Sequence, residues 1–203
     1  DLIEENGGKA IEIVGDLSDR KSVENIVQQS IASQGGIDIL LNNGGTIARY
    51  PAAEFPMDEW DRVIEVILPA SFLLAKFCAP TMMANGGGKI INIASMLSYS
   101  GGITVPAYTA SKHAVAGITK ALANEWAQHN IQVNAIAPGY FRTDNTQKLQ
   151  DDPVRNQEIQ KRIPAQRWGE PSDLGGTAVF LASHASDYIN GALINVDGGW
   201  MDR

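Results

Sequence analysis

Short apolar runs alternate along the chain with longer stretches in which apolar positions recur every three to four residues. Short runs bounded by glycine or polar residues indicate buried β-strands, and the longer period indicates amphipathic helices. The pattern predicts strands at 10–15 (AIEIVG), 37–43 (IDILLNN), 89–95 (KIINIAS), 131–138 (IQVNAIAP) and 192–199 (ALINVDGG). It predicts helices at 19–35, 56–86, about 105–129, within 141–163 and at 170–186.

This alternation predicts an α/β fold: a Rossmann-like, doubly wound parallel sheet with helices on both faces. The 37–43 run is too apolar for a half-exposed strand and suits a parallel strand that is covered on both faces. Within the 56–86 helix, Pro69 is expected to kink or break the chain, because proline lacks the N–H that an interior turn requires.

Composition narrows the classes of protein that fit. With 203 residues, 44% of them apolar and 19% charged, the chain suits one globular domain spanning 1–203. A formal charge of −7 argues against a nucleic-acid partner, because phosphates favour clustered Lys and Arg. An apolar run of the roughly 20 residues needed to cross a bilayer is not expected, so no membrane partner is predicted.

Cysteine usage and the first residues bear on location. The single cysteine, Cys78, cannot form an internal disulfide and reads as a small buried apolar residue in a reducing cytoplasm. The opening residues, DLIEENGGKA, are polar and acidic, unlike a signal peptide. The three histidines show no metal-ligand spacing, so no metal is predicted.

The most informative chemistry lies in the stretch 95–112. Tyr108 and Lys112 are four residues apart, so on a helix their side chains lie on the same face. An ammonium near the phenol is expected to lower the tyrosine pKa toward working pH, and such a tyrosine can exchange a proton with a substrate oxygen. Ser95 ends a predicted strand, at the edge where ligands of parallel sheets bind.

Several motifs together with this spacing make the chain resemble the short-chain dehydrogenase/reductase family. Ser95 lies thirteen residues before the tyrosine of YTASK (108–112), as in the family signature. The other matching segments are GDLSD (15–19), LLNNGG (40–45), APGYFRT (137–143) and DYINGALINVDGG (187–199). The resemblance runs essentially from end to end and implies hydride transfer between NAD or NADP and a secondary alcohol or ketone.

Residue roles follow from that resemblance, position by position. It implies that Tyr108 is the general acid/base, that Lys112 lowers the tyrosine pKa and holds the nicotinamide ribose, and that Ser95 orients the substrate carbonyl. The cofactor-binding residues that it implies, besides Tyr108 and Lys112, are Asp16 and Leu17 at the adenine, Asn42, Asn43 and Gly45 in a loop beside the cofactor, and Pro138, Gly139 and Thr143 at the nicotinamide.

A narrower set of segments looks like the 2-deoxy-D-gluconate 3-dehydrogenase group, also called 2-keto-3-deoxy-gluconate dehydrogenases. These segments are KIINIASMLSYSGG, ANEWAQHNIQVNAIAPGY, RIPAQRWGEPSDL and VDGGW. The small-molecule substrate would then be a sugar acid such as 2-deoxy-D-gluconate. An arginine near the site would suit its carboxylate, and Arg49, Arg142 and Arg167 are the candidates.

The chain departs from the family pattern at its start. The family opens with a strand, a glycine-rich turn and a helix whose N-terminus receives the pyrophosphate, whereas NGGGK (85–89) precedes a strand and is a turn. Without this first βαβ unit, the 10–15 strand has no neighbour and the 37–43 strand keeps an open apolar edge. We therefore expect either a fragment of a longer chain or a truncated member with impaired cofactor binding.

Two substitutions fall near the expected site. Ile67 stands where the family has a catalytic asparagine, and an isoleucine cannot hold the water of a proton relay. Gly44 replaces the alanine of the family's NNAG loop, which loosens the loop without removing a polar group.

Two further functions stay open at this point. Ser95, Tyr108 and Lys112 could form a cofactor-independent ester hydrolase with an activated serine, although the chain has no G-x-S-x-G elbow. A catalytically silent truncated homologue is the other possibility. The VDGGW terminus and the 105–129 helix resemble surfaces that assemble family members, so a homo-oligomer, dimer or tetramer, is expected from the resemblance.

Overall fold

A four-stranded parallel sheet forms the centre of the computed structural model, which describes residues 2–203. Each strand pairs in parallel with the next one along the chain, so the order in space is β1-β2-β3-β4. The strands are β1 (Ile39–Asn42), β2 (Gly88–Ile93), β3 (Ile131–Pro138) and β4 (Leu193–Val196).

Helices connect these strands and account for most of the remaining chain. The α-helices are α1 (Leu2–Glu5), α2 (Arg20–Gln34), α3 (Met57–Ala84), α4 (Pro106–Trp126), α5 (Gln147–Asp151), α6 (Pro153–Arg162) and α7 (Ser172–Ala182). Short 3₁₀ turns lie at η1 (Ala52–Glu54), η2 (Met96–Ser98), η3 (Ala127–His129), η4 (Asp144–Thr146), η5 (His184–Ser186) and η6 (Trp200–Asp202).

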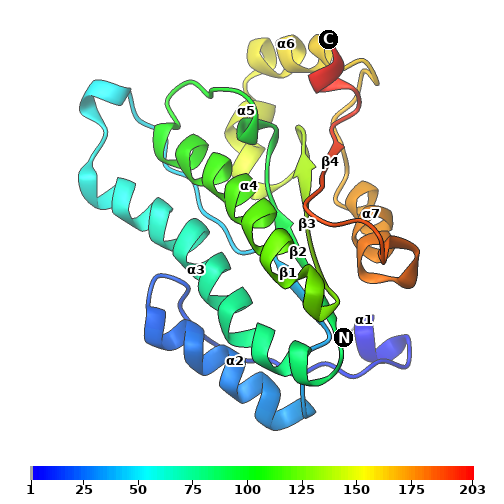
Figure 1. Cartoon of the computed structure of the whole chain (residues 1–203). Coiled ribbons are helices and arrows are strands. Elements are labelled where there is room, and N and C mark those ends of the chain that lie inside the picture. The colour runs from blue at the N-terminus through cyan, green and yellow to red at the C-terminus, as the bar shows by residue number, and fades with distance from the viewer. Residues whose placement is uncertain (1) are drawn as a thin grey trace.

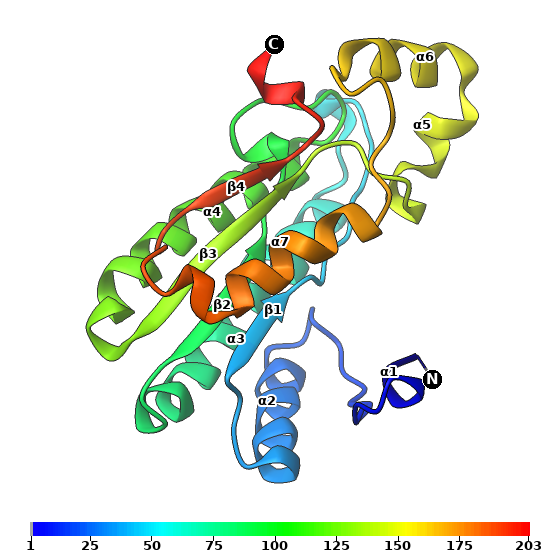
Figure 2. The same cartoon turned by 90° about the vertical axis from the view of Figure 1, so that its right-hand side faces the viewer.

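The helices cover both faces of the sheet, as the alternating pattern predicts. Helices α3 and α4 lie side by side against one face, and α2 packs on α3 (Figure 1). Helix α7 crosses the opposite face over β2 and β3 (Figure 2). Side chains alternate accordingly: Ile90 and Val133 enter the core under α3 and α4, whereas Ile91 and Ile136 pack with Leu181 of α7. The predicted Rossmann-like architecture is therefore confirmed.

The observed strand boundaries agree best with the predicted ones in the middle of the sheet. β3 has the predicted bounds, but β1 is only four residues long and is not covered on both faces. Ile39 and Leu41 of β1 are 48% and 46% exposed, and among residues 2–203 no strand pairs with the outer edge of β1. The expectation of a fully covered strand is wrong here, and the expectation of an open apolar edge is confirmed.

The predicted strand at 10–15 is wrong, because these residues have no regular secondary structure. The segment runs as an irregular connection between α1 and α2 (Figure 2), with Ile11 and Val14 exposed. A strand forms only where a neighbour satisfies its N–H and C=O groups. In this structure β1 pairs with β2 alone, so the segment's apolar alternation has no ladder to join.

Helix α3 does not break at Pro69. It runs without interruption over 28 residues and contains both Pro69 and Pro80. Packing along its length compensates for the lost donors, because the helix buries residues from Val63 to Met82. By length and composition alone α3 could also span a membrane, contrary to the expectation of no such run, but the core helix of a globular protein passes the same test.

A chain of buried polar side chains crosses the sheet from β1 to α4. The Asn42 amide donates to the Asn92 side-chain oxygen at 2.8 Å, and the Asn92 amide donates to the Thr119 hydroxyl at 2.9 Å. The Thr119 hydroxyl in turn donates to the Val115 carbonyl within α4. Because Asn42, Asn92 and Thr119 are all buried, these bonds fix α4 against the sheet.

We expect Thr119→Val to lower the free energy of unfolding by about 1–3 kcal/mol, because it leaves the buried Asn92 amide without an acceptor. Urea unfolding followed by circular dichroism measures the change.

Thr109→Val on the same helix is the matched control. The Thr109 hydroxyl is also buried but has no hydrogen-bond partner among the described residues. Its removal should therefore leave the stability unchanged or raise it. Equal losses in the two variants would contradict the structural role given to the polar chain.

Candidate active site

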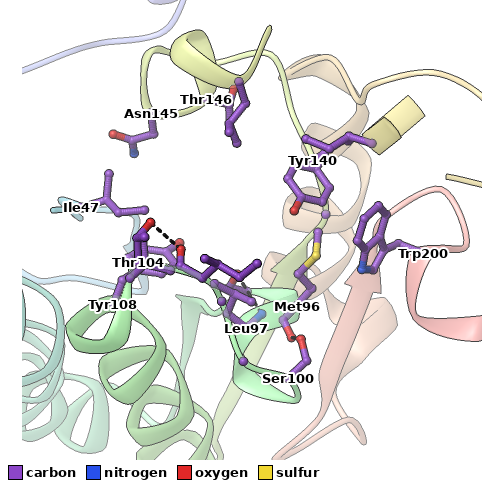
Figure 3. A pocket seen from close by; sticks show the side chains of 18 of the residues that line it. Ile47, Met96, Leu97, Ser100, Thr104, Tyr108, Tyr140, Asn145, Thr146 and Trp200 are labelled. Carbon is purple, nitrogen blue, oxygen red and sulfur yellow. Dashed lines mark hydrogen bonds between the residues drawn. The ribbon is translucent and has the colours of Figure 1, made fainter. Parts of the chain in front are cut away.

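A cavity of about 610 Å³ opens at the carboxyl ends of β2 and β3, where parallel sheets bind their ligands. Ser95 enters it from the turn after β2, and Gly139 from the turn after β3. Tyr108 of α4 lies on one side and Trp200 near the C-terminus on the other (Figure 3). Residues of η4, α5 and α6 complete the wall.

Local structure explains how Ser95 and Tyr108 come to face this cavity. Ser95 is fully extended, and its hydroxyl accepts the Leu97 N–H at 3.1 Å, which starts the η2 turn. Val105 is the N-cap of α4 and Pro106 its first residue, a position where proline's missing donor has no cost. Tyr108 therefore lies in the first turn of α4, within reach of hydrogen bonding by Ser95.

Lys112 lies one turn further along α4 and behind Tyr108. Its ammonium donates to the Ile93 carbonyl at 2.5 Å and lies 5.5 Å from the centre of the Tyr108 ring. The residue is only 4% exposed, and this burial lowers the pKa of Lys112 to about 8. The structure thus brings Ser95, Tyr108 and Lys112 together, although Lys112 does not line the cavity itself.

The pKa of Tyr108 is raised, which corrects the expectation that Lys112 lowers it. Burial of the phenol is the largest cause, and it outweighs the opposing effects of Ser95 and of the Arg49 charge. The Lys112 ammonium lies over the ring and is bound to the Ile93 carbonyl, and it is not among the groups that shift the phenol. Arg49 is the positive charge that favours the phenolate here.

A second cavity, of about 320 Å³, lies beside the end of β1. Leu17, Asn42 and Asn43, three of the predicted cofactor residues, line it together with Gly44. Asn42 is buried, and its side-chain oxygen has no partner within the described part of the chain. An unpaired buried acceptor is costly, so this cavity suits a ligand that carries N–H or O–H donors.

The remaining predicted cofactor residues are spread around the two cavities. Gly139 lines the large cavity, and Pro138 ends β3 just before it. Thr143 caps the η4 turn, and Asp16 is exposed, its carboxylate accepting the Ser18 N–H and hydroxyl. Gly45 lines neither cavity. The cofactor roles of these residues stay predictions.

Ile67 is buried in an apolar cluster with Val63, Ala107 and Val115. Its side chain offers no polar atom toward Tyr108, which packs against the same cluster, and its carbonyl accepts the Ser71 hydroxyl at 2.7 Å. A Cβ at Gly44 would meet only the end of the Leu17 side chain, which can move aside, so nothing in the structure requires glycine at this position.

Of the three candidate arginines, only Arg49 lines the large cavity. Arg142 pairs with Glu170 at 3.0 Å and Arg167 with Asp173 at 2.6 Å, both at exposed positions away from it. Sequence reasoning missed the contributions of α6 and the C-terminus, which are Arg155, Glu158, Arg162 and Trp200. The three α6 residues are spaced i, i+3 and i+7, which places them on one face of the helix, and this spacing is the sequence signal that could have indicated them.

A parallel α/β sheet whose ligand cavity at the carboxyl edge is lined by a serine and a tyrosine, with a lysine behind the tyrosine, is an α/β architecture equipped for proton transfer to or from a bound ligand. Residues 1–201 match the family described as "Enoyl-(Acyl carrier protein) reductase". The chain therefore belongs to this short-chain dehydrogenase/reductase family of oxidoreductases.

Known proteins similar to the chain cover nearly all of it. It is 52% identical over 202 residues to a 2-dehydro-3-deoxy-D-gluconate 5-dehydrogenase of Bacillus subtilis (strain 168), covering 100% of this chain and 79% of that protein. A protein of the same name from Dickeya dadantii (strain 3937) is 54% identical over 198 residues, covering 97% of this chain and 78% of its own. The crystal structure of a gluconate 5-dehydrogenase from Burkholderia cenocepacia J2315 in complex with NADP and tartrate is 40% identical, with a TM-score of 0.96, covering 100% of this chain and 79% of that one.

Burial of Lys112 predicts a stability that rises with pH between 8 and 9. The folded state releases its proton near pH 8, whereas the unfolded chain keeps it up to about 10.5, so the unfolded state binds more protons in this window. The free energy of unfolding should rise by about 1 kcal/mol from pH 8 to 9, as measured by urea unfolding.

Lys112→Met should remove this rise, and Lys120→Met, at an exposed position of the same helix, should retain it. The window stops at pH 9 because burial raises the pKa of Cys78 from 9.0 to about 11, and this shift lowers the stability increasingly as the pH approaches and passes 9. A rise that persists in Lys112→Met would show that another group is responsible.

Proposed function

We propose that the protein interconverts a secondary alcohol and a ketone on a small sugar acid, with NAD or NADP as the hydride carrier. The observation that carries the proposal is the placement of Tyr108 and Ser95 on one cavity, with an arginine charge acting on the phenol. The similarity to proteins named sugar-acid dehydrogenases supports the substrate class.

Tyr108 is the group that exchanges the proton. In the oxidation direction the substrate hydroxyl gives its proton to the Tyr108 oxygen while its carbon gives up a hydride, so the C–O single bond becomes a carbonyl. The Ser95 hydroxyl holds the same substrate oxygen by a hydrogen bond. Arg49 stabilises the phenolate form that the oxidation needs, because its charge opposes the effect of burial.

The cofactor, when bound, supplies a nicotinamide ring that accepts or donates the hydride. Lys112 uses one of its three N–H donors on the Ile93 carbonyl, and the family resemblance implies that the remaining donors would hold ribose hydroxyls once the buried ammonium is reached from the cavity. Asn42 would provide an acceptor, and the 320 Å³ cavity would provide space, for the part of the cofactor next to this ribose. The NADP named with the Burkholderia cenocepacia structure supports a nicotinamide dinucleotide, and the residues implied to hold it remain those named from the sequence.

Ester hydrolysis is the weaker alternative. A serine nucleophile needs a base that takes its proton. The Lys112 ammonium is bound to the Ile93 carbonyl, and the Ser95 oxygen already accepts the Leu97 N–H. The close similarity to proteins named dehydrogenases also favours the oxidoreductase.

The proposal includes three further expectations, which concern the domain organisation, the cellular location and the assembly of the protein. We propose that residues 1–203 form one dinucleotide-binding-type domain, that the protein acts in the cytoplasm, and that it assembles as a homo-oligomer. The buried, unreactive Cys78 and the half-exposed Phe72 on α3 are consistent with the second and third of these.

Tyr108→Phe should abolish NAD(P)-dependent oxidation of sugar acids, because it removes the phenol that takes the proton of the reacting hydroxyl. The absorbance of the reduced nicotinamide measures the rate. Tyr99→Phe is the matched control, since Tyr99 lies close by in sequence but does not line the cavity.

Activity that survives in Tyr108→Phe would overturn the proposed acid/base. A chromogenic ester assay without cofactor tests the alternative in the same preparations: hydrolysis that disappears in Ser95→Ala but persists in Tyr108→Phe would favour the hydrolase.

Arg49→Gln should raise the pKa of Tyr108 further, since it removes the positive charge that favours the phenolate. The basic group in the pH profile of kcat/KM for alcohol oxidation should therefore move to higher pH. Arg49→Lys keeps a charge and should stay closer to the native profile; a downward shift in Arg49→Gln would contradict the assignment.

A further inference from the structure

Helix α6 presents charged side chains to the wall of the large cavity. Arg155, Glu158 and Arg162 line it from this helix, and the apolar Ile159 between them is buried and anchors the helix. These residues lie outside the Ser95, Tyr108 and Lys112 group. The face therefore contributes charge to the cavity without contributing to proton transfer.

The two α6 arginines differ in how their charge is balanced. The Arg155 guanidinium pairs with the Glu158 carboxylate at 3.1 Å. No carboxylate within residues 2–203 lies at ion-pair distance from Arg162. Its charge is thus available to a ligand, whereas that of Arg155 is largely offset by its neighbour.

Trp200 holds the Arg162 guanidinium in place. The guanidinium carbon lies 4.0 Å from the centre of the Trp200 ring, a cation–π arrangement. Trp200 is only 7% exposed and makes an edge contact with Tyr140 at 4.7 Å, and Tyr140 makes another with Trp168 at 5.4 Å. The aromatic support is therefore rigid.

A stacked guanidinium is well suited to bind a carboxylate. Stacking occupies the face of the planar group and leaves its N–H donors free at the edge, where they match two carboxylate oxygens. Such a pre-ordered arginine loses less side-chain entropy on binding than a free one.

The position of this arginine relative to Tyr108 separates it from Arg49. Trp200 and Tyr108 lie on opposite sides of the cavity (Figure 3), so Arg162 over Trp200 is remote from the phenol. Arg49 is close enough for its charge to act on Tyr108. A carboxylate bound at Arg49 would cancel that charge and raise the Tyr108 pKa, which opposes alcohol oxidation.

We propose that Arg162, stacked on Trp200, binds the carboxylate of the sugar acid and that the reacting carbon lies at the end of the substrate away from this carboxylate. The assignment rests on the proposed function and makes it more specific. It selects acids over neutral polyols, and the reacting carbon that it favours in a hexonate, C5, is the position in the names of the similar dehydrogenases.

Arg162→Gln tests the assignment with two substrates, D-gluconate and D-glucitol, in which CH₂OH replaces the carboxylate. We expect KM for D-gluconate to rise by about tenfold or more, since hydrogen bonds to charged groups are worth more than neutral ones. The values of kcat, and of KM for D-glucitol, should change little. Lys161→Gln makes the same charge change at the preceding residue of α6, outside the cavity lining, and should leave the preference for the acid as it is.

Calorimetric titration of D-gluconate provides a second measurement that needs no turnover. Binding should weaken in Arg162→Gln and be largely rescued in Arg162→Lys, and nuclear magnetic resonance of the product should show the ketone at C5. Equal effects of Arg162→Gln on both substrates, loss of the acid preference in Arg49→Gln instead, or oxidation next to the acid group would each overturn the assignment.

Failure of the proposed oxidoreductase function can be distinguished from failure of the Arg162 carboxylate site. A protein that binds D-gluconate through Arg162 without any redox turnover contradicts the proposed function and retains the carboxylate site. A protein that oxidises sugar acids with the same preference in Arg162→Gln contradicts only the carboxylate site.

Discussion

The hydrogen bond from the Lys112 ammonium to the Ile93 carbonyl joins the two elements on which the site depends. It ties the helix that carries Tyr108 to the end of the strand that delivers Ser95, and the Ser98 hydroxyl adds a second tie by donating to the Lys112 carbonyl at 2.7 Å. A buried ammonium is costly unless it is hydrogen-bonded, so this contact is strongly favoured wherever the helix docks. Two turns further on, the Asn92–Thr119 bond repeats the same attachment between strand and helix. The relative position of serine and tyrosine follows from these contacts and not from the loop between them.

Burial shifts the pKa values of Tyr108 and Lys112 in opposite directions, and in both residues it favours the uncharged form. It raises the pKa of Tyr108, which makes the phenolate harder to form, and it lowers the pKa of Lys112 to about 8, which makes the ammonium easier to deprotonate. The phenolate then depends on the groups at the cavity side of the ring, the Ser95 hydroxyl and the Arg49 charge. A lysine behind the ring and an arginine in front of it therefore divide two tasks, anchoring the helix and tuning the phenol.

Local pattern predicted the elements that pack against several neighbours. β3 forms with the predicted bounds because it is paired on both sides, and the Tyr108–Lys112 spacing placed both residues on one face of α4. The pattern failed where the outcome depends on a partner: residues 10–15 alternate like a strand yet have no ladder, and Pro69 stays helical because α3 is held by its packing. The direction of the Tyr108 pKa could not be predicted either, since i, i+4 spacing does not say where an ammonium points. Arg142 and Arg167 could not be separated from Arg49 by sequence, because only the fold shows which arginines have carboxylate neighbours.

The charges of the cavity contrast with those of the whole chain. The formal charge is −7, yet the wall contains three arginines and one carboxylate, and that carboxylate is already paired with Arg155. A locally positive concavity on an acidic protein attracts small anions and concentrates them at the site, while the remaining surface repels larger polyanions. With Arg49 beside the phenol and Arg162 on the far aromatic wall, the two arginines of the cavity that have no ion-pair partner within residues 2–203 lie at opposite ends of it. An anion with a single carboxylate can satisfy only one of them, and the orientation that leaves Arg49 free for Tyr108 is the one in which proton transfer is favoured.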